Sequence, residues 1–264
     1  MPPQTDAVLE VSDVARGFGG LMAVDGCSLQ VPRGSLAALI GPNGAGKTTL
    51  ANLIAGALKP DRGRIKFDGT DITGWTSHRI ARRRLIRTFQ ISREFAGLTV
   101  LENLVAVAPH QAGENFFTAV LRPAVGKRQD AELAELALAR LNTFGLHALR
   151  DEYAGNLSGG QKRLLELARA VMAEPNLLIL DEPMAGVNPA LVQLLVTHIQ
   201  SLRKEGITFL MIEHNLNVVE QLCDYVIVMA EGRTLATGTM AELRKNEEVI
   251  HAYLGGSLHA RAAS

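Results

Sequence analysis

The 264-residue sequence has little cysteine, no excess of charge of either sign and no long apolar run. Its two cysteines, Cys27 and Cys223, form no disulfide framework and are typical of a reducing compartment, and we expect both to be buried, inert thiols. Lysine plus arginine and aspartate plus glutamate each number 27, so the formal net charge is zero. Proteins held on nucleic acid by bulk charge usually have a basic excess, so this balance argues against that class.

The sequence also lacks the segments that direct a chain into or across a membrane. Its start, MPPQTDAVLEVSD, has no basic region followed by an apolar run, so we do not expect a secretory signal. A spanning helix needs about 20 apolar residues, and the longest runs, such as SLAALIG, are much shorter. We therefore expect a soluble, cytoplasmic protein that acts at a membrane only through a partner.

What the sequence does contain is an alternation of short apolar runs with helical periodicity, which predicts an α/β fold. Helices are predicted for GKTTLANLIAGAL, for Gly159–Ala173 and for Pro189–Lys204. The predicted strands are AVLEVSDVARGF, SLAALIG, GRIKFDG, NLLILDEP, ITFLMIEH and DYVIVMAEGR.

The middle of the chain differs from both ends. From about Ser92 to Asn156 no convincing strand is found, and DAELAELALARLNTFGL carries apolar residues at helical spacing, namely Leu133, Leu136, Leu141 and Phe144. We interpret this stretch as a helical insertion in an α/β core. The predicted organisation is one domain over 1–264, with a core of 1–91 and 157–256, a helical subdomain of about 92–156 and a frayed tail of 257–264.

The strongest chemical signal is GPNGAGKT, which matches the phosphate-loop pattern through Gly41, Gly46, Lys47 and Thr48. It follows a predicted strand and opens a predicted helix, which is the context that the pattern requires. Glycines let backbone N–H groups turn towards phosphate oxygens, and a helix N-terminus adds partial positive charge. Lys47 is expected on the β- and γ-phosphates and Thr48 on Mg²⁺; the alternative is a glycine-rich turn that happens to contain Lys-Thr.

Acidic residues end one of the apolar strands. In NLLILDEP, Asp181 and Glu182 would lie beyond the carboxyl end of a strand, where parallel α/β sheets bind their ligands. Asp181 is expected to hold Mg²⁺ or its water, and Glu182 to polarise an attacking water. The alternative is a helix cap or a solvated pair of carboxylates.

Two further polar residues are candidates for the same site. His214 ends ITFLMIEH and is expected to contact the γ-phosphate, although a structural histidine is the alternative. Gln90 can coordinate Mg²⁺ or a water through its amide oxygen. The remaining histidines show no metal-ligand spacing. The arginines near Gln90 are interpreted as a solvated helix face, with contact to a partner or a lipid headgroup as the alternative; they are Arg79, Arg82, Arg83, Arg84 and Arg87.

A second anion-binding pattern lies far downstream, in NLSGGQKR. Ser158 can cap a helix, and Gly159 and Gly160 leave its first N–H groups open to an anion. A chain that already has a phosphate loop needs no second one for the same ligand, so this pattern requires a separate explanation.

Taken in order, the phosphate loop, Gln90, LSGGQ, LDEP and His214 resemble the nucleotide-binding subunit of ABC transporters, over nearly the whole chain. The resemblance implies a P-loop NTPase with a RecA-like ABC core, an antiparallel β subdomain and a helical subdomain. It implies hydrolysis of ATP with Mg²⁺, and a head-to-tail dimer. In that family each ATP lies between the phosphate loop of one subunit and the signature sequence of the other.

The resemblance also implies roles for individual residues. Phe18 would stack on adenine, although a core phenylalanine is the alternative; Gln90 would sense Mg²⁺ and the attacking water, Asp181 would support Mg²⁺, Glu182 would be the general base and His214 would contact the γ-phosphate. The phosphate loop would comprise Gly41, Pro42, Asn43, Gly44, Ala45, Gly46, Lys47, Thr48 and Thr49. The ATP of the opposite subunit would meet Ser158, Gly159, Gly160 and Gln161. One departure is Asn188 in MAGVNP, where the family often has aspartate.

A narrower resemblance is carried by RGFGGLMAVDG, IRTFQISREFAGLTVLENLVAV, ENFFTAVLRP, AGVNP and HAYLGG. These segments resemble the ATPase subunits of branched-chain amino acid importers, of the LivG type. That family implies two permease subunits, a second ATP-binding subunit, an external substrate-binding protein and a place at the cytoplasmic face of the inner or plasma membrane. The resemblance leaves open whether the ATPase pair is a homodimer or a heterodimer.

The inserted ENFFTAVLRP contains an apolar cluster, interpreted either as a covered surface loop or as a permease contact; its members are Phe116, Phe117, Val120 and Leu121. An ATPase of another ABC system, such as lipopolysaccharide export, is the main alternative function. ABC ATPases of DNA repair are disfavoured because sustained heptads are missing. Translation-type ABC proteins are disfavoured because there is one cassette, and GTPases because no Asn-Lys-x-Asp motif occurs.

Overall fold

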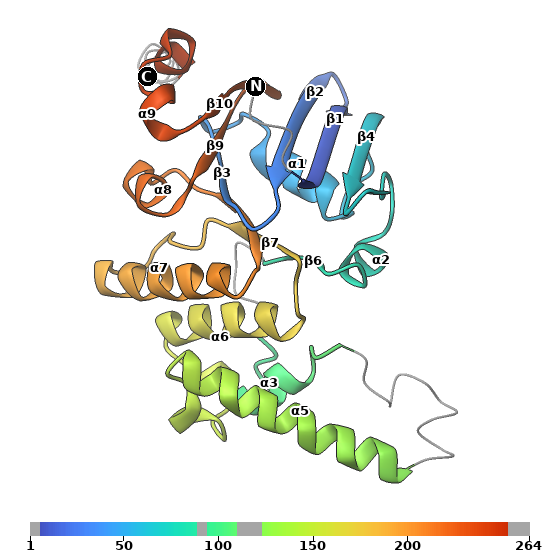
Figure 1. Ribbon diagram of the computed structural model, residues 1–264, viewed down its shortest axis with the longest axis vertical. Helices are drawn as coiled ribbons and strands as arrows, with labels where there is room; N and C mark the ends of the chain where they lie inside the picture. Colours follow the sequence, from blue (N-terminus) through green and yellow to red (C-terminus); the bar gives the residue numbers. More distant parts are fainter. Residues whose placement is uncertain (1–5, 89–93, 110–122, 253–264) are drawn as a thin grey trace. The chain divides into compact units, whose positions relative to one another are not determined.

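The computed structural model describes residues 6–88, 94–109 and 123–252. The chain divides into two compact units (Figure 1). The first consists of Met1–Arg87, Asn176–Ala185 and Ile199–Ser264, and the second of Thr88–Pro175 and Gly186–His198. The predicted apolar cluster at Phe116–Leu121 and the predicted tail at 257–264 lie outside the described residues. No helix among the described residues is long and apolar enough to cross a bilayer.

The first unit contains a four-stranded antiparallel sheet of order β2-β1-β4-β5. Its strands are β1 (Ala7–Phe18), β2 (Leu21–Pro32), β4 (Arg62–Phe67) and β5 (Thr70–Asp71). The strands AVLEVSDVARGF and GRIKFDG were predicted, whereas β2 was not. The pairing of β1 with β2 contains several register shifts, which interrupt the alternation of buried and exposed residues by which a strand is recognised.

The same unit contains a six-stranded sheet of order β10-β9-β3-β8-β7-β6. β3 is parallel to β8 and β9, β7 is parallel to β8 and β6, and β10 is antiparallel to β9 at the edge. The strands are β3 (Leu36–Ile40), β6 (Leu85–Arg87), β7 (Leu177–Asp181), β8 (Thr208–Ile212), β9 (Tyr225–Ala230) and β10 (Arg233–Gly238).

The central strands explain where a ligand site can form. Every residue of β3, β7 and β8 is buried, as expected for parallel strands that are covered on both faces. In the register of the sheet, Ile212 of β8 lies opposite both Leu39 of β3 and Asp181 of β7. The carboxyl ends of these three strands are therefore level, and the segments that leave them meet at one edge of the sheet.

Helix α1 (Lys47–Ile54) follows β3 and shares one hydrophobic core with both sheets. Leu50 and Ile54 of α1 belong to the same cluster of buried side chains as Val11 of the antiparallel sheet and Leu39 of the parallel one. A second cluster joins β9 to α8 (Leu216–Leu222) and α9 (Met240–Leu243). The buried side chains of α1 therefore pack in one core with both sheets.

The cysteines lie in these clusters. Cys27 on β2 is fully buried, and Cys223, just after α8, is half-buried. Burial raises the pKa of both thiols, so the thiolate form is disfavoured. The prediction of buried, inert thiols is confirmed for Cys27, whereas Cys223 is only partly covered.

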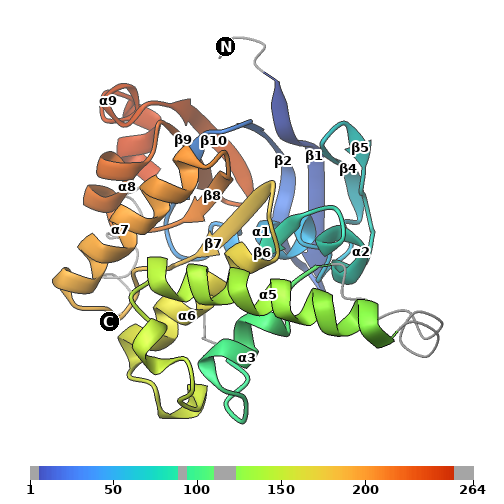
Figure 2. The same cartoon turned by 60° about the horizontal axis from the view of Figure 1, so that its bottom comes forward.

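The second unit is helical. Figure 2 shows α3 (Val100–Val105), α5 (Pro123–Thr143) and α6 (Gly159–Met172) side by side, and each packs against the other two. Short 3₁₀ turns lie at His147–Leu149 and Ala154–Asn156. A lone β-bridge pairs Thr99 with Tyr153. Helix α7 (Pro189–Lys204) begins in this unit and has the predicted bounds.

The helical spacing of the apolar residues in α5 is borne out in part. Leu141 and, just after the helix, Phe144 are buried and Leu133 is half-buried, but Leu136 is 38% exposed and does not belong to the core. Asn103 of α3 is fully buried, and its amide bonds to the backbone of the preceding segment at Phe95, Leu98 and Thr99. Because a buried amide needs hydrogen-bond partners, Asn103 holds that segment against α3.

Candidate active site

The phosphate loop leaves β3 after Ile40 and enters α1 at Lys47. Gly46 caps the helix with a φ of 93°, in the left-handed region that favours glycine. A Cβ atom at Gly46 would overlap the carbonyl oxygen of Ala23, and a Cβ atom at Gly41 would overlap that of Met229. The pattern of glycines that the sequence analysis identified is thus required by neighbouring backbone, and the loop takes up the strand–loop–helix context that was predicted.

Lys47 is folded back onto its own loop. Its Nζ atom donates to the carbonyl oxygens of Gly41, at 2.8 Å, and Pro42, at 2.9 Å. Burial lowers the pKa of Lys47, an effect that the carboxylates of Glu182 and Asp181 oppose. An ammonium group has three N–H donors, so one remains for a phosphate oxygen after these two bonds.

Three residues of the loop are exposed to solvent. Asn43, Gly44 and Thr48 are exposed, and Thr49 is half-buried. Thr48 is the second residue of α1, and its exposed hydroxyl can contact a metal ion that is bound to a phosphate in the loop.

Asp181 ends β7 with its side chain only 1% exposed. One carboxylate oxygen, Oδ2, forms an ion pair of 2.6 Å with Nη2 of Arg87 on β6. The other, Oδ1, is buried and has no hydrogen-bond partner among the described residues. A buried carboxylate oxygen is costly without a partner, so Oδ1 fits an incoming cation or its water.

Arg87 corrects one prediction. It was interpreted as part of a solvated helix face, but α2 covers only Ser77–Ala81, and Arg87 lies on β6 with its side chain 11% exposed. Its guanidinium donates to Asn52 at 2.6 Å as well as to Asp181. The run of arginines hides this role because nothing local distinguishes Arg87 from its neighbours.

These residues fit a magnesium ion only together with a substrate. No group of three or more histidine, cysteine, aspartate or glutamate side chains that could hold a metal occurs among the described residues. Mg²⁺ is commonly held by one or two protein oxygens and by substrate phosphates. The Thr48 hydroxyl and Oδ1 of Asp181 provide protein oxygens of that kind, and the phosphate loop lies between β3 and α1 beside them.

Glu182 and His214 face each other at the same edge of the sheet. Nε2 of His214 lies 3.5 Å from Oε2 of Glu182. Glu182 has a φ of 49°, and its backbone N–H donates to the carbonyl of Ile212 at 3.0 Å, so the turn after β7 is tied to the end of β8. The imidazole is about half exposed, whereas the carboxylate is mostly covered.

Glu213 is a part of this site that the sequence analysis missed. It is 2% exposed, and its carboxylate accepts from the backbone N–H groups of Met184, His214 and Asn215. It thereby connects the segment after β7 to the segment after β8. The sequence feature that could have identified Glu213 is its position, as a charged residue directly between an apolar strand and the candidate histidine His214.

Phe18 ends β1 with 45% of its surface exposed, so it is not a core phenylalanine. The guanidinium of Arg16 lies 5.1 Å from the centre of its ring. Leu21 and Met22, at the start of β2, are exposed nearby in the sheet, since Phe18 pairs with Leu21. An exposed aromatic ring can accept a flat heterocycle by stacking.

The LSGGQ segment lies in the second unit, at the start of α6. The Ser158 hydroxyl accepts from the N–H of Gln161 at 3.3 Å, and the Gln161 side chain accepts from the N–H of Ser158 at 2.9 Å. This reciprocal capping box is the predicted cap. A Cβ atom at Gly159 would meet nothing within 4 Å, so the approach to the first turn is open there.

Gln90 and Asn188 are the two residues of the predicted set that remain. Gln90 lies outside the described residues. Asn188, which stands where the family often has aspartate, caps α7 through Oδ1, which accepts from the N–H of Leu191 at 2.9 Å. Asparagine and aspartate are equally good caps, so the departure leaves the start of this helix intact.

A family model described as ABC transporter matches residues 24–185, which is more than half of the chain. The chain belongs to the ABC transporter family. A second model, described as branched-chain amino acid ATP-binding cassette transporter, matches residues 233–259 of this ABC cassette. The predicted family is thereby confirmed.

Relatives of the cassette extend over nearly its whole length. The probable branched-chain amino acid transport ATP-binding protein LivG of Archaeoglobus fulgidus is 40% identical over 248 residues, covering 94% of this chain and 95% of the relative. The high-affinity branched-chain amino acid transport ATP-binding protein BraF of Pseudomonas aeruginosa is 41% identical over 249 residues, covering 94% and 98%. The chain is thus similar to the LivG type that the sequence predicted.

Solved structures of ATP-binding cassettes have the same fold as this chain. A nucleotide-free ATP-binding cassette from an ABC transporter superposes with a TM-score of 0.80 at 36% identity, covering 94% of this chain and 99% of that one. A cassette in its ADP conformation gives a TM-score of 0.79 at 35% identity, covering 95% and 100%. The prediction of an ABC ATPase with a P-loop NTPase fold is confirmed, while the roles of individual residues stay predictions.

Proposed function

We propose that this chain is the ATP-hydrolysing subunit of an importer for branched-chain or other hydrophobic amino acids. The observation that carries the proposal is the convergence of the phosphate loop, Asp181, Glu182 and His214 at one edge of the parallel sheet, in a chain about 40% identical to branched-chain amino acid transport proteins. These relatives favour import over the alternative of lipopolysaccharide export.

In this proposal ATP binds with its phosphates in the loop Gly41–Thr49 and its adenine on Phe18. Backbone N–H groups at the start of α1 and the third N–H of Lys47 hold the β- and γ-phosphates. Mg²⁺, held by Thr48, Gln90 and Asp181, would neutralise charge on the phosphates. The orphaned Oδ1 of Asp181 supports this assignment.

Hydrolysis requires a water positioned in line with the γ-phosphate. Glu182 accepts a proton from that water as the water oxygen attacks phosphorus, the bond to the β-phosphate oxygen breaks, and ADP and inorganic phosphate leave. His214, 3.5 Å from Glu182, contacts the γ-phosphate, and Gln90 senses Mg²⁺ and the water. Glu213 is a positioning residue, because its carboxylate holds the backbone of His214.

The proposal explains why the chain carries two anion-binding patterns. The segment Ser158–Gln161 would bind the ATP of a second ATP-binding subunit, whether a second copy of this chain or a relative. The capping box at Ser158 and the open approach at Gly159 support an anion at this helix start. The two patterns are then halves of one composite site.

The remaining parts of the proposal concern the assembly. The chain would function as a single nucleotide-binding domain, peripheral at the cytoplasmic face of the inner or plasma membrane. Its partners would be integral-membrane permease subunits and, through them, an external substrate-binding protein. Nucleic acid is not among them.

Uptake by living cells tests the proposal. Cells whose gene for this chain is deleted should take up labelled leucine, isoleucine and valine poorly, and the wild-type gene should restore uptake. A gene encoding Lys47→Ala should not restore it, although the protein accumulates normally, since the phosphates lose their point charge. Normal uptake of all three amino acids in the deleted strain would contradict the choice of cargo, and restoration by Lys47→Ala would contradict the ATP dependence.

A further inference from the structure

The β9–β10 hairpin lies against the phosphate loop. At the end of β9, the carbonyl oxygen of Met229 is so close to Gly41 that a side chain there would overlap it. In the turn that follows, the backbone N–H of Gly232 donates to the carbonyl oxygen of Ala45 at 3.1 Å. The loop is thus contacted at its first glycine and at its centre by a segment nearly 200 residues downstream.

The hydrogen bond from Gly232 to Ala45 fixes the orientation of the whole peptide group between Ala45 and Gly46. A trans peptide is planar, with the C=O of one residue and the N–H of the next pointing in opposite directions. Because the Ala45 carbonyl points towards Gly232, the N–H of Gly46 points away from the hairpin. Gly46 caps α1, and its N–H belongs to the group of donors at the helix start that receives phosphate oxygens.

The hairpin turn is itself held on its other side. The N–H of Asp25 on β2 donates to the carbonyl of Gly232 at 2.9 Å. Gly232 has a φ of 78°, and a Cβ atom there would lie 3.0 Å from the Asp25 nitrogen and 3.1 Å from the Ala23 carbonyl oxygen. Since these are backbone atoms, a side chain at Gly232 must push the turn away from β2, and with it the bond to Ala45.

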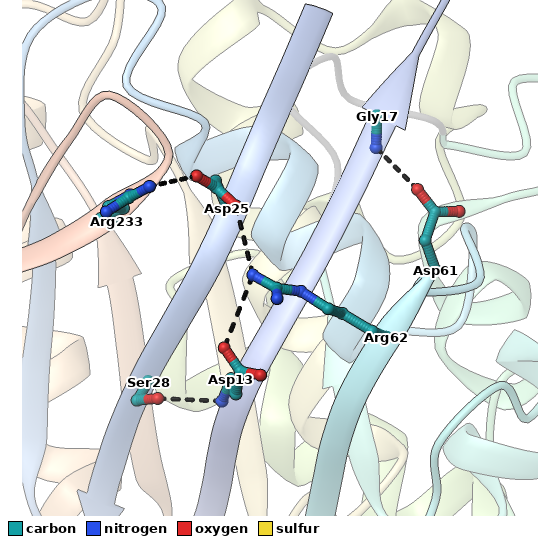
Figure 3. A network of polar contacts seen from close by, with 7 residues as sticks. All are labelled: Asp13, Gly17, Asp25, Ser28, Asp61, Arg62 and Arg233. Atoms are coloured by element: carbon teal, nitrogen blue, oxygen red, sulfur yellow. Dashed lines mark hydrogen bonds and ion pairs between the residues drawn. The ribbon is translucent and has the colours of Figure 1, made fainter.

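A charged cluster of Asp25, Arg62 and Arg233 links the hairpin to β2 and β4 (Figure 3). Arg233, the first residue of β10, donates to Oδ2 of Asp25, and Arg62 of β4 donates to Oδ1 at 3.2 Å. The hydrogen bond from Arg233 holds the pKa of Asp25 below its usual range, so the carboxylate stays ionised at neutral pH. The two carboxylate oxygens of Asp25 therefore accept hydrogen bonds from guanidinium groups on two different strands.

We propose that the β9–β10 hairpin positions the phosphate loop through Gly232, and that Asp25 and Arg233 hold the hairpin in place. The hydrogen bonds of the Asp25 side chain run to Arg233 and Arg62, so Asp25 and Arg233 are positioning residues for nucleotide binding rather than catalytic ones. This inference rests on the proposed ATP site. It adds to that site a set of supporting residues on β2 and on the β9–β10 hairpin.

The first test compares two glycines in equivalent turns. Gly69, in the β4–β5 turn, has a φ of 69° and follows a residue of positive φ, as Gly232 does, but a Cβ atom there would meet nothing within 4 Å. Gly69→Ala and Gly232→Ala therefore carry the same backbone cost and differ in what surrounds them. We expect Gly232→Ala to raise the Kd for MgATP about tenfold, the size of a lost hydrogen bond to a charged group. Gly69→Ala should keep the wild-type Kd.

The second test addresses the charged cluster through Arg233, whose side chain is exposed, and Asp25, which is half-buried. Arg233→Ala and Asp25→Ala should each raise the Kd for MgATP about threefold, the scale of an exposed ion pair. The double variant should be no weaker than either single one, because both remove the same link. Arg233→Lys should recover part of the affinity. Arg244→Ala, which breaks the exposed pair of Arg244 with Glu220 away from the loop, is the matched control.

Calorimetric titration of the full chain with MgATP, and melting without nucleotide, decide between the outcomes. The inference predicts weaker MgATP binding in Arg233→Ala, with a melting temperature equal to that of Arg244→Ala. It also predicts weaker binding in Gly232→Ala than in Gly69→Ala at a temperature where both variants are fully folded, because the crowded turn at Gly232 also lowers the melting temperature. Equal affinities in all four variants would overturn it, as would an affinity loss in Arg233→Ala that only parallels a fall in its melting temperature. If the wild-type chain itself binds no MgATP, the proposed function fails, which is a different result.

Discussion

The ion pair between Arg87 and Asp181 is expected to hold the candidate active site together, and Arg87→Met tests this. The N–O distance is 2.6 Å, and the side chains are 11% and 1% exposed. Substituting Arg87 leaves the buried Asp181 carboxylate without its ion-pair partner. Removing one partner of a buried pair costs about 3–5 kcal/mol. At about 2–4 °C per kcal/mol for a chain of this size, the melting temperature should fall by roughly 10 °C.

An exposed arginine–carboxylate pair in the same chain provides the control. Arg244 and Glu220 form an ion pair with the same N–O distance of 2.6 Å, but their side chains are 55% and 48% exposed. Exposed pairs contribute about 0.2–1 kcal/mol. Arg244→Met should therefore lower the melting temperature by only about 1–3 °C.

A second substitution identifies the cause of the loss. Adding Asp181→Asn to Arg87→Met removes the uncompensated charge, and the double variant should recover about 2 kcal/mol relative to Arg87→Met. Thermal unfolding followed by circular dichroism, with nucleotide absent, measures all of these variants. A melting temperature of Arg87→Met within a few degrees of that of Arg244→Met would contradict a stabilising role of the buried pair, as would a double variant no more stable than Arg87→Met.

Three further predictions concern nucleotide binding. Lys47→Ala should lose most MgATP affinity in calorimetric titration, because the β- and γ-phosphates lose their only loop ammonium. Phe18→Ala should weaken MgATP binding about fivefold to thirtyfold, since a stacked base is worth roughly 1–2 kcal/mol, and should leave pyrophosphate binding unchanged. Ser158→Arg should abolish hydrolysis while the isolated chain still binds ATP, because Ser158 is assigned to the site of the opposite subunit.

Each of these predictions has a result that would contradict it. Wild-type affinity in Lys47→Ala would remove the phosphate loop from the ATP site. An equal loss of ATP and pyrophosphate affinity in Phe18→Ala would place Phe18 in the general fold rather than under the base. Loss of ATP binding by the isolated Ser158→Arg chain would mean that LSGGQ and the phosphate loop do not belong to separate subunits.

Sequence patterns predicted the elements that carry a clear local signal. β3, β7 and β8 are buried throughout, so their apolar runs are continuous and easily recognised. The helix Gly159–Ala173 was predicted from its cap and ends one residue earlier, at Met172. β2 and β10 were missed because bulges interrupt β2 and much of β10 is partly exposed, so neither shows a clean period of two.

The site was predicted where its chemistry is carried by a local motif, and missed where it depends on distant pairing. Lys47 and Glu182 belong to motifs that are read from the sequence. The partner of Asp181 is Arg87, which lies 94 positions away and is brought close only because β6 pairs with β7. Glu213 likewise reaches Met184 across two neighbouring strands. Such pairs follow from strand order, which local periodicity does not specify.

Glu182 is assigned to take the proton from the attacking water, and the rate of phosphate release from ATP by Glu182→Gln measures this role. Glu174→Gln is the matched control, because Glu174 has nearly the same φ, 48° against 49°, and is exposed elsewhere in the fold. We predict that Glu182→Gln binds MgATP as wild type does but hydrolyses it about 10²–10⁴ times more slowly, while Glu174→Gln keeps the wild-type rate. Phosphate release by Glu182→Gln at the wild-type rate would contradict the account.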